Sequence, residues 1–224
     1  MSNDTQPQHL KSDTPIVVLG ATSGIGALVA DEALRHGLSV RGFARSANNM
    51  AHRDRLEPIA GDARNPDDLK RAVQGAQAVI YALGIKERPA MLWAHETLFS
   101  QSTEVLLDVM ATAGVTRLVA VTGFGAGRSR AAMSSVEKLG HGLLLGRVYA
   151  DKSRQEELIQ SSALDWTIVR PVILTKGPRT GRYRVLSKPS AWRNGLISRS
   201  DVAEYLVRSV IEGLNLREDV VLTR

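Results

Sequence analysis

A glycine-rich turn near the start of the chain carries the clearest chemistry in the sequence. The letters GATSGIG at residues 20–26 follow a continuous apolar run, residues 16–19, and precede apolar residues at helical spacing. In that context such a turn holds a dinucleotide: Gly20 permits the tight bend, Gly24 lets the backbone approach the pyrophosphate, and Gly26 allows close helix–strand packing. Free N–H groups at the start of the helix bind the anion. The predicted cofactor residues of this turn are Gly20, Thr22, Ser23, Gly24, Ile25 and Gly26; a plain strand–helix turn is the alternative.

The end of the second predicted strand, residues 38–44, determines which nicotinamide cofactor fits. An enzyme that prefers NAD places a carboxylate there, which accepts hydrogen bonds from the ribose hydroxyls. This chain instead has the letters FARS at residues 43–46, with Arg45 in the third place. A guanidinium there attracts a 2′-phosphate and can bind it through two hydrogen bonds, so the sequence favours NADP(H) over NAD(H). Arg41 on the same strand is a second candidate, and the alternative is that Arg45 is a solvated surface charge.

The basic surplus of the chain is confined to one segment. There are 29 Lys and Arg residues against 23 Asp and Glu, a formal net charge of +6. Eight of the basic residues and no acidic one lie between Asp165 and Asp201, which leaves 21 basic against 23 acidic residues elsewhere. A positive segment of this kind suits an anionic small-molecule substrate. The candidate contacts are Arg179, Arg182 and Arg184; the alternative is a solvated charged loop.

Composition argues against several other classes of protein. Aromatic residues are only 4% of the 224 residues, and single-strand nucleic-acid binders need aromatic stacking platforms, so we expect no nucleic-acid partner. The chain has no cysteine, no apolar run of the ~20 residues that a membrane helix needs, and a polar start unlike a signal peptide. We therefore expect a cytoplasmic protein that binds no membrane. The five histidines show no metal-ligand spacing, and we expect no metal site.

Strand and helix patterns alternate from residue 15 to the end of the chain. Continuous apolar runs predict strands covered on both faces, as in a parallel sheet, and residues at helical spacing separate them. The predicted strands are 16–19, 38–44, 58–60, 78–83, 118–121, 166–169 and 220–222; helices follow residue 25, begin at 65 and 201, and cover about 95–113 and 150–162, with a glycine-rich loop over 123–146. The alternation predicts one α/β domain over 15–224, a Rossmann-type doubly wound parallel sheet with helices on both faces. Residues 1–14 are expected to be a disordered arm, and about 171–200 a small substrate region.

Further motifs occur along the rest of the chain. They are Gly61-Asp62, Ala82-Leu83-Gly84, Lys152 with Glu156, Thr167-Ile168-Val169-Arg170-Pro171, and Ser198 to Ala203. With the glycine turn, they resemble the short-chain dehydrogenase/reductase superfamily over residues 16–223, in particular its atypical NmrA-like and biliverdin reductase B (flavin reductase) members. The resemblance implies that Asp62 hydrogen-bonds the adenine amine and that Lys152 binds the nicotinamide ribose. The other cofactor contacts that it implies are Ala63, Ala82, Leu83, Gly84, Thr122, Pro171, Val172 and Ile173; a turn cap at Asp62 and a solvated Lys152 are the alternatives.

The residues expected to do the chemistry depart from that family in two places. In classical members a tyrosine four residues before the lysine exchanges a proton with the substrate; here Val148 holds that place and Tyr149 comes one residue late. The fifth strand of relatives commonly ends in Ser-Ser or Thr-Ser, whereas this chain reads Thr122-Gly123. Other hydroxyls in the following loop are those of Ser134 and Ser135. The catalytic candidates are Thr122, Tyr149 and Lys152, with packing as the alternative for Tyr149.

Three functions are compatible with these residues. The first is an NADP(H)-dependent oxidoreductase that transfers a hydride to a small anionic or planar acceptor, such as a flavin, a tetrapyrrole, a quinone or a ketone. The displaced Tyr149 favours the second, a non-enzymatic NADP(H)-binding sensor of the NmrA type. The third is a relative of the nucleotide-sugar epimerases and dehydratases. We expect a monomer or homodimer whose partner is a small molecule.

Overall fold

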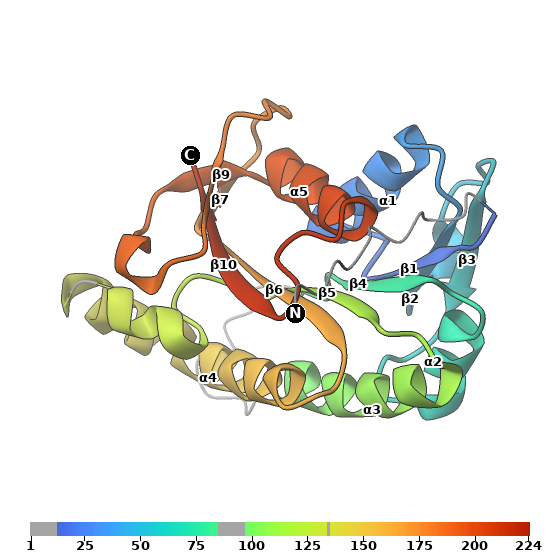
Figure 1. Ribbon diagram of the computed structural model, residues 1–224, viewed down its shortest axis with the longest axis horizontal. Helices are drawn as coiled ribbons and strands as arrows, with labels where there is room; N and C mark the ends of the chain where they lie inside the picture. The colour runs from blue at the N-terminus through green and yellow to red at the C-terminus, as the bar shows by residue number, and fades with distance from the viewer. Residues whose placement is uncertain (1–12, 85–96, 134) are drawn as a thin grey trace, which may run out of the picture.

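An eight-stranded sheet lies at the centre of the part of the chain that the computed structural model describes, residues 13–84, 97–133 and 135–224 (Figure 1). In order across the sheet, its strands are β3 (Leu56–Ala60), β2 (Val40–Ala44), β1 (Ile16–Leu19), β4 (Ala78–Tyr81), β5 (Arg117–Val121), β6 (Asp165–Pro171), β10 (Glu218–Thr223) and β8 (Arg184–Leu186). Neighbouring strands from β3 to β10 are parallel, and β8 pairs antiparallel with β10 at the edge. The strand order reverses between β1 and β4, the point at which doubly wound sheets bind their ligands.

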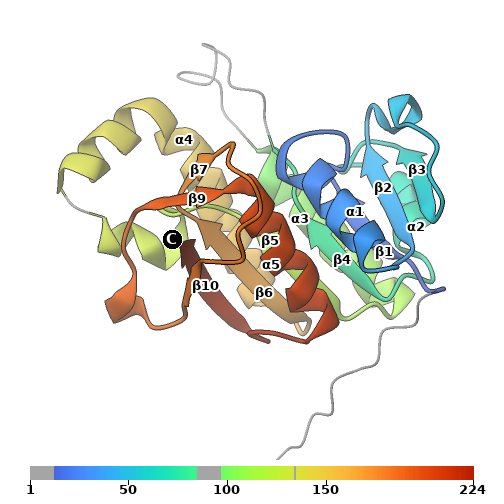
Figure 2. The ribbon, with the colours of Figure 1, turned by 90° about the horizontal axis from the view of Figure 1, so that it is seen from above.

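Helices cover both faces of this sheet (Figure 1, Figure 2). One face carries α1 (Gly24–Arg35) and α5 (Arg199–Ile211), and the other carries α2 (Pro66–Val73), α3 (Leu98–Ala113) and α4 (Ser135–Gln160). Side chains of β1 alternate between the two layers, because Ile16 and Val18 belong to the apolar cluster under α1 and α5, and Val17 and Leu19 to the cluster under α2 and α3. Burial on both faces explains the continuous apolar runs. The predicted Rossmann-type doubly wound fold is confirmed.

Capping side chains determine where two of the helices begin. Asn65 Oδ1 accepts hydrogen bonds from the backbone N–H groups of Asp67 at 2.9 Å and Asp68 at 3.3 Å, at the start of α2. At the start of α5, Ser198 Oγ accepts one from the N–H of Asp201 at 3.0 Å. Both helices therefore begin close to their predicted positions.

Predictions about the second half of the chain need correction. The expected glycine-rich loop over 123–146 becomes helical at Ser135, so α4 is 26 residues long. Each glycine weakens a helix by about 1 kcal/mol, but the Leu, Glu and Lys residues before and between the glycines of α4 are strong helix formers. The segment over about 171–200, for which no strand is predicted, contains β8 and two further strands, β7 (Ile173–Thr175) and β9 (Leu196–Ser198), which pair in a separate parallel sheet. The main sheet is not wholly parallel, because β8 closes its edge in the opposite direction.

Smaller differences concern single turns and segment ends. β2 begins two residues later and β3 two residues earlier than predicted, and β4 ends at Tyr81. Short 3-10 turns occupy Ala47–Asn49, Gly127–Ala132 and Pro189–Ala191. Residues 1–12 of the predicted arm, the start of the helix predicted over 95–113, and Ser134 lie outside the described residues.

Candidate active site

The glycine-rich turn joins β1 to α1 and touches the end of β4. Gly20 has a φ of +88°, and a Cβ at this position would lie 2.6 Å from the carbonyl oxygen of Ala82. A Cβ on Gly26 would overlap the carbonyl oxygen of Gly20, so α1 starts in direct contact with the turn. Gly24 has a φ of +59° and open space around its Cα. The tight bend predicted at Gly20 and the close packing predicted at Gly26 are therefore present, and Gly24 leaves the backbone open to a ligand.

The first turn of α1 has N–H groups that its N-cap side chain leaves uncapped. Ser23 is the N-cap residue, but its side chain makes no capping hydrogen bond, and the first turn holds no acidic residue. By contrast, α2 and α5 have side-chain caps and acids in their first turns. Thr22 and Ile25 are partly exposed beside Ser23. The pyrophosphate of a dinucleotide fits this cradle, because a helix N-terminus combines partial positive charge with available donors.

The loop after β2 places a hydroxyl beside the glycine turn, next in sequence to an exposed arginine. Arg45 is exposed directly after the strand, and Ser46 Oγ donates a hydrogen bond to Thr22 Oγ1 at 3.2 Å. Arg41 is directed elsewhere, since its guanidinium binds Glu57 at 2.9 Å and two carbonyl oxygens at the end of α2. The structure therefore removes Arg41 from the candidates for a cofactor phosphate. It leaves Arg45 and adds Ser46, which the sequence prediction missed.

Asp62 follows β3 and interacts electrostatically with Arg45. The carboxylate accepts hydrogen bonds from the backbone N–H of Arg64 at 3.0 Å and from the guanidinium of the same residue at 2.9 and 3.2 Å. These hydrogen bonds lower the pKa of Asp62 to about 2, and the charge of Arg45 adds to the effect. The turn-capping alternative for Asp62 is present in the structure. Ala63 beside it is buried, and a contact of either residue with adenine stays a prediction.

The predicted cofactor residues after β1, β4, β5 and β6 meet along one edge of the sheet. The N–H of Ala82 donates to the carbonyl oxygen of Leu19 at 3.0 Å, and the N–H of Thr122 donates to that of Val169 at 2.9 Å. We call Gly20, Ala82, Thr122 and Pro171 the carboxyl-edge row. Nearby, Leu83 is partly buried, Gly84 is exposed, Val172 is buried and Ile173 is exposed. A dinucleotide in this fold lies across such strand ends.

Lys152 reaches the end of β5 from helix α4. Its Nζ donates a hydrogen bond to the carbonyl oxygen of Thr122 at 2.7 Å and lies 4.5 Å from the centre of the Phe99 ring. Burial lowers the pKa of Lys152 to about 8, against the opposing effects of Glu156 and Asp151. The alternative of a fully solvated lysine is wrong, because this side chain is partly buried against the strand end.

Tyr149 lies one turn before Lys152 and meets the next residue of the same strand end. A Cβ on Gly123 would lie 2.8 Å from Tyr149 Oη, so the phenol covers the α-carbon of the glycine. Val148, at the position of the tyrosine in classical relatives, is buried in the core. Burial raises the pKa of Tyr149, so the phenol is protonated at neutral pH. The structure brings Tyr149 to the site and places Val148 away from it.

The hydroxyl of Thr122 belongs to a buried hydrogen-bond network. Thr122 Oγ1 donates to Glu156 at 2.6 Å, Arg170 donates to both oxygens of Glu156 at 3.0 and 2.6 Å, and Arg170 Nη1 donates to Asp219 at 2.6 Å. Arg128 completes this ion-pair network by pairing with Asp219. Burial would raise the pKa of Asp219, but the two arginines hold it below its ordinary value. Thr122 therefore donates its hydroxyl proton to Glu156 in this structure, and its predicted role in catalysis stays a prediction.

The ion-pair network also reaches into the predicted substrate region. The ring of Trp192 lies 5.0 Å from the guanidinium of Arg170 and 5.5 Å from that of Arg128, and its Nε1 donates to the carbonyl oxygen of Leu186 at 2.8 Å. The motif residues Glu156 and Arg170 thus join α4 to β6, β10 and residues 186–192. From the sequence, these two residues are only parts of motifs that resemble the family, and their structural role was not predicted.

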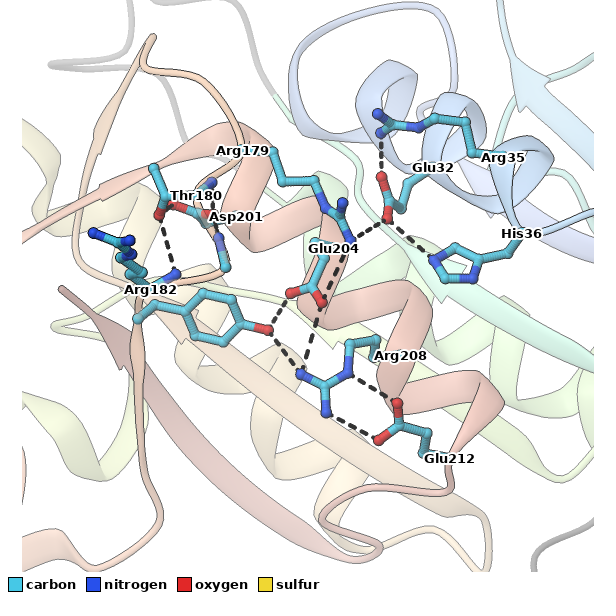
Figure 3. Close-up of polar contacts among 12 residues, drawn as sticks. Glu32, Arg35, His36, Arg179, Thr180, Arg182, Asp201, Glu204, Arg208 and Glu212 are labelled. Atoms are coloured by element: carbon cyan, nitrogen blue, oxygen red, sulfur yellow. Dashed lines mark hydrogen bonds and ion pairs between the residues drawn. The ribbon is translucent and has the colours of Figure 1, made fainter.

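The predicted substrate arginines do not gather at the row. Arg179 Nη2 lies 3.3 Å from Glu32 on α1 and 3.8 Å from Glu204 on α5, on the face of the sheet that these two helices cover (Figure 3). Arg184 Nη2 donates to the carbonyl oxygen of Arg224 at 3.3 Å. Arg182 is exposed and points away from the acidic residues around Arg179 (Figure 3). The prediction of Arg179 as a substrate contact is therefore not kept, because the carboxylates of Glu32 and Glu204 neutralise its charge.

A family model described as NAD(P)H-binding matches residues 20–212, from the first glycine of the turn to the end of α5. The chain belongs to this NAD(P)H-binding family. It is similar to an uncharacterized chloroplast protein of Arabidopsis thaliana, with 27% identity over 206 residues that cover 88% of this chain and 72% of that protein. The NAD(P)H-binding part of the predicted resemblance is confirmed by this family model.

Two solved structures share the fold of this family member. The anaerobilin reductase ChuY of Escherichia coli O157:H7 has a TM-score of 0.77 and 24% identity, covering 94% of this chain and 97% of that one. A wide-type short-chain dehydrogenase/reductase of Veillonella parvula, in complex with NADP, has a TM-score of 0.78 and 17% identity, covering 94% of each chain. At these identities the likeness establishes the fold. Within the described ranges, none of the helices combines the length and apolar character of a membrane span.

Proposed function

We propose that this protein is an NADP(H)-dependent oxidoreductase that reduces a small planar or anionic acceptor, such as a flavin, a tetrapyrrole, a quinone or a ketone. The meeting of Lys152 and Tyr149 at the end of β5, which only β4 separates from the strand before the glycine turn, carries the proposal. Bound NADPH supplies a hydride. In this proposal the turn holds the pyrophosphate, Arg45 holds the 2′-phosphate and the ammonium of Lys152 holds the ribose hydroxyls.

An exposed apolar pair supports a planar acceptor. Ile173 on β7 and Leu196 on β9 are register partners, directly beyond Pro171 of the carboxyl-edge row, and they are 58% and 55% exposed. Register partners in neighbouring strands point to the same side of a sheet, so the two side chains form one apolar ledge. A conjugated ring system fits such a ledge, and Arg182 stays the candidate partner for an anionic group. The likeness to ChuY, an anaerobilin reductase, agrees with an acceptor of this class.

A non-catalytic NADP(H) sensor is the second candidate function. The observation that favours it concerns the position four residues before Lys152, where classical relatives have the catalytic tyrosine. Here that position is a valine, Val148, and its side chain is buried. The two functions share the cofactor site and differ in turnover, because a sensor binds the dinucleotide without consuming it.

The deciding experiment measures binding and turnover separately. Quenching of tryptophan fluorescence gives the Kd for NADPH and for NADH, and NADPH oxidation is then followed with FMN, a linear tetrapyrrole, a quinone and a ketone. We expect tighter binding of NADPH and turnover with at least one planar acceptor, lost in Lys152→Met. Tight NADPH binding without turnover on any acceptor supports the sensor instead.

Arg45→Ala is expected to remove the preference for NADPH. A hydrogen bond to a charged group contributes about 1.5–3 kcal/mol, so the Kd for NADPH should rise roughly 10- to 100-fold while that for NADH changes little. Arg53→Ala is the matched control, because Arg53 is also exposed but pairs with Asp31. Fluorescence titration of both variants checks the prediction; equal preference for NADPH in wild type and Arg45→Ala contradicts it.

The affinity for NADPH is expected to fall as the pH rises through about 8, the pKa to which burial brings Lys152. Below that pH the protonated amine can donate both to the Thr122 carbonyl and to a ribose hydroxyl; above it, one donor and the positive charge are lost. In Lys152→Arg, whose guanidinium stays charged, the decline should move to higher pH. Titrations between pH 6 and about 9.5 test this, and identical profiles for wild type and Lys152→Arg would exclude the lysine.

A further inference from the structure

The end of β5 presents no side-chain hydroxyl along the carboxyl-edge row. The Thr122 hydroxyl is used by Glu156, and the next residue is Gly123, which has no side chain. The backbone of Gly123 does not explain the glycine, because its φ lies outside the left-handed region that other residues avoid. What the glycine provides at this position is space.

The phenol of Tyr149 occupies that space. A Cβ on Gly123 would lie 2.8 Å from Oη and 3.3 Å from Cε1 and Cζ of the tyrosine, so a side chain at this position would push the phenol aside. Advancing one residue along a helix turns a side chain by about 100°, and this turn separates buried Val148 from Tyr149. The late tyrosine and the missing strand-end hydroxyl are therefore in contact with each other.

Lys152 holds the same strand end from one turn further along α4. Its ammonium binds the Thr122 carbonyl at 2.7 Å while the Tyr149 ring covers Gly123. Two functional groups of one helix thus contact two consecutive residues at the end of one strand. Burial raises the pKa of Tyr149, so its phenol is protonated at neutral pH.

We propose that Gly123 and Tyr149 form a complementary pair, in which the absent side chain seats the phenol and the phenol supplies the hydroxyl that the strand end lacks. Tyr149 is then the catalytic acid, and Gly123 is the residue that positions it. This inference rests on the proposed reductase function and narrows its acceptor to a conjugated molecule with a basic oxygen or nitrogen next to the reducible system.

The proton balance of the step follows from this assignment. The acceptor takes a hydride at one atom from the cofactor, which is oxidised, and a proton from Tyr149 Oη at its oxygen or nitrogen. The phenol O–H bond breaks as the new O–H or N–H bond forms, and water returns a proton to the phenolate. One acceptor molecule thus gains two electrons and two hydrogens in each turnover.

A double-mutant cycle on turnover tests the pair. Tyr149→Phe is expected to lower kcat about 100-fold or more, and Gly123→Ala to lower it roughly 10- to 100-fold by moving the phenol, with the Kd for NADPH within about twofold in both. In the Tyr149→Phe background, Gly123→Ala should cause little further loss, because no phenolic hydroxyl is left to displace. Tyr183→Phe, which removes a phenol bound to Glu204 on the other face, is the control and should keep wild-type turnover.

A second readout requires no turnover. Gly123→Ala should lower the urea midpoint of unfolding in the wild-type background, and less so with Tyr149→Ala, where the space is empty. Additive losses in kcat, or equal midpoint shifts in the two backgrounds, overturn the pair. Turnover that survives in Tyr149→Phe overturns the catalytic role alone, whereas wild-type protein that binds NADPH and reduces no acceptor overturns that role together with the proposed function.

Discussion

Replacing Arg170 by methionine is expected to lower the free energy of unfolding by about 3–5 kcal/mol. The guanidinium is completely buried and is the common partner of Glu156 and Asp219, which are themselves 1% and 3% exposed. Methionine fills much of the volume of the arginine. It leaves Glu156 as a buried charge whose one remaining hydrogen-bond donor within this network is the Thr122 hydroxyl. A loss of this size is a large fraction of the stability of an ordinary domain.

Urea unfolding of three variants separates this effect from general sensitivity to lost ion pairs. Arg71→Ala removes a pair with Asp68 in which the arginine is 62% exposed, and such surface pairs contribute about 0–1 kcal/mol. Arg170→Met combined with Glu156→Leu removes both charges and should recover part of the loss, because the remaining carboxylate, Asp219, keeps Arg128. A loss below about 1 kcal/mol in Arg170→Met would show that the network is solvated and contributes little.

Much of the fold could be predicted because its signals are local. The four residues of β1 and the four of β4 are apolar and completely buried, and a continuous apolar run of that length indicates a strand covered on both faces. Asn65 caps the helix that directly follows it. Sequence reasoning missed α4 before residue 150 because its glycines weaken a helix locally, while the residues between them and its tertiary packing favour one. The three-residue strands β7, β8 and β9 are too short to show a period.

Long-range pairing explains where the site prediction failed. The acid-free segment between Asp165 and Asp201 suggested a positive surface for a substrate, but the partners of Arg179 are Glu32 and Glu204, on two different helices. Local charge patterns cannot reveal such partners, since only the packing of α1 on α5 brings the two acids together. The surplus of +6 is therefore less concentrated in space than it is in sequence.

Contacts also change the meaning of the two departures from the family pattern. In sequence, Gly123 and Tyr149 look like two separate losses, one of a hydroxyl and one of a correctly spaced phenol. In the structure they touch, so the loss at one position makes room for the residue at the other. The glycine-rich turn, by comparison, could be assigned from sequence because all its determinants lie within seven residues.

Gly26→Ala is expected to weaken NADPH binding by about 100-fold or more and to destabilise the fold by about 1–3 kcal/mol. The new Cβ would overlap the carbonyl oxygen of Gly20 and lie 2.6 Å from its carbonyl carbon and 3.2 Å from the nitrogen of Ala21. All three atoms belong to the backbone, so no flexible side chain can yield. The start of α1 must move away from the turn, and the N–H groups that would hold the pyrophosphate move with it.

Gly114→Ala separates loss of the cradle from the general effect of replacing a glycine. Gly114 ends α3 with a φ of +69° and has open space around it, so an alanine there adds a left-handed strain of about 1–2 kcal/mol without a clash. It should lower the urea midpoint and leave the Kd for NADPH unchanged. Gly26→Ala should change both, and its loss of affinity should persist well below the unfolding transition, where the chain is still folded. Wild-type affinity in Gly26→Ala would mean that the dinucleotide does not bind at the start of α1, because only there does the new methyl group displace the backbone.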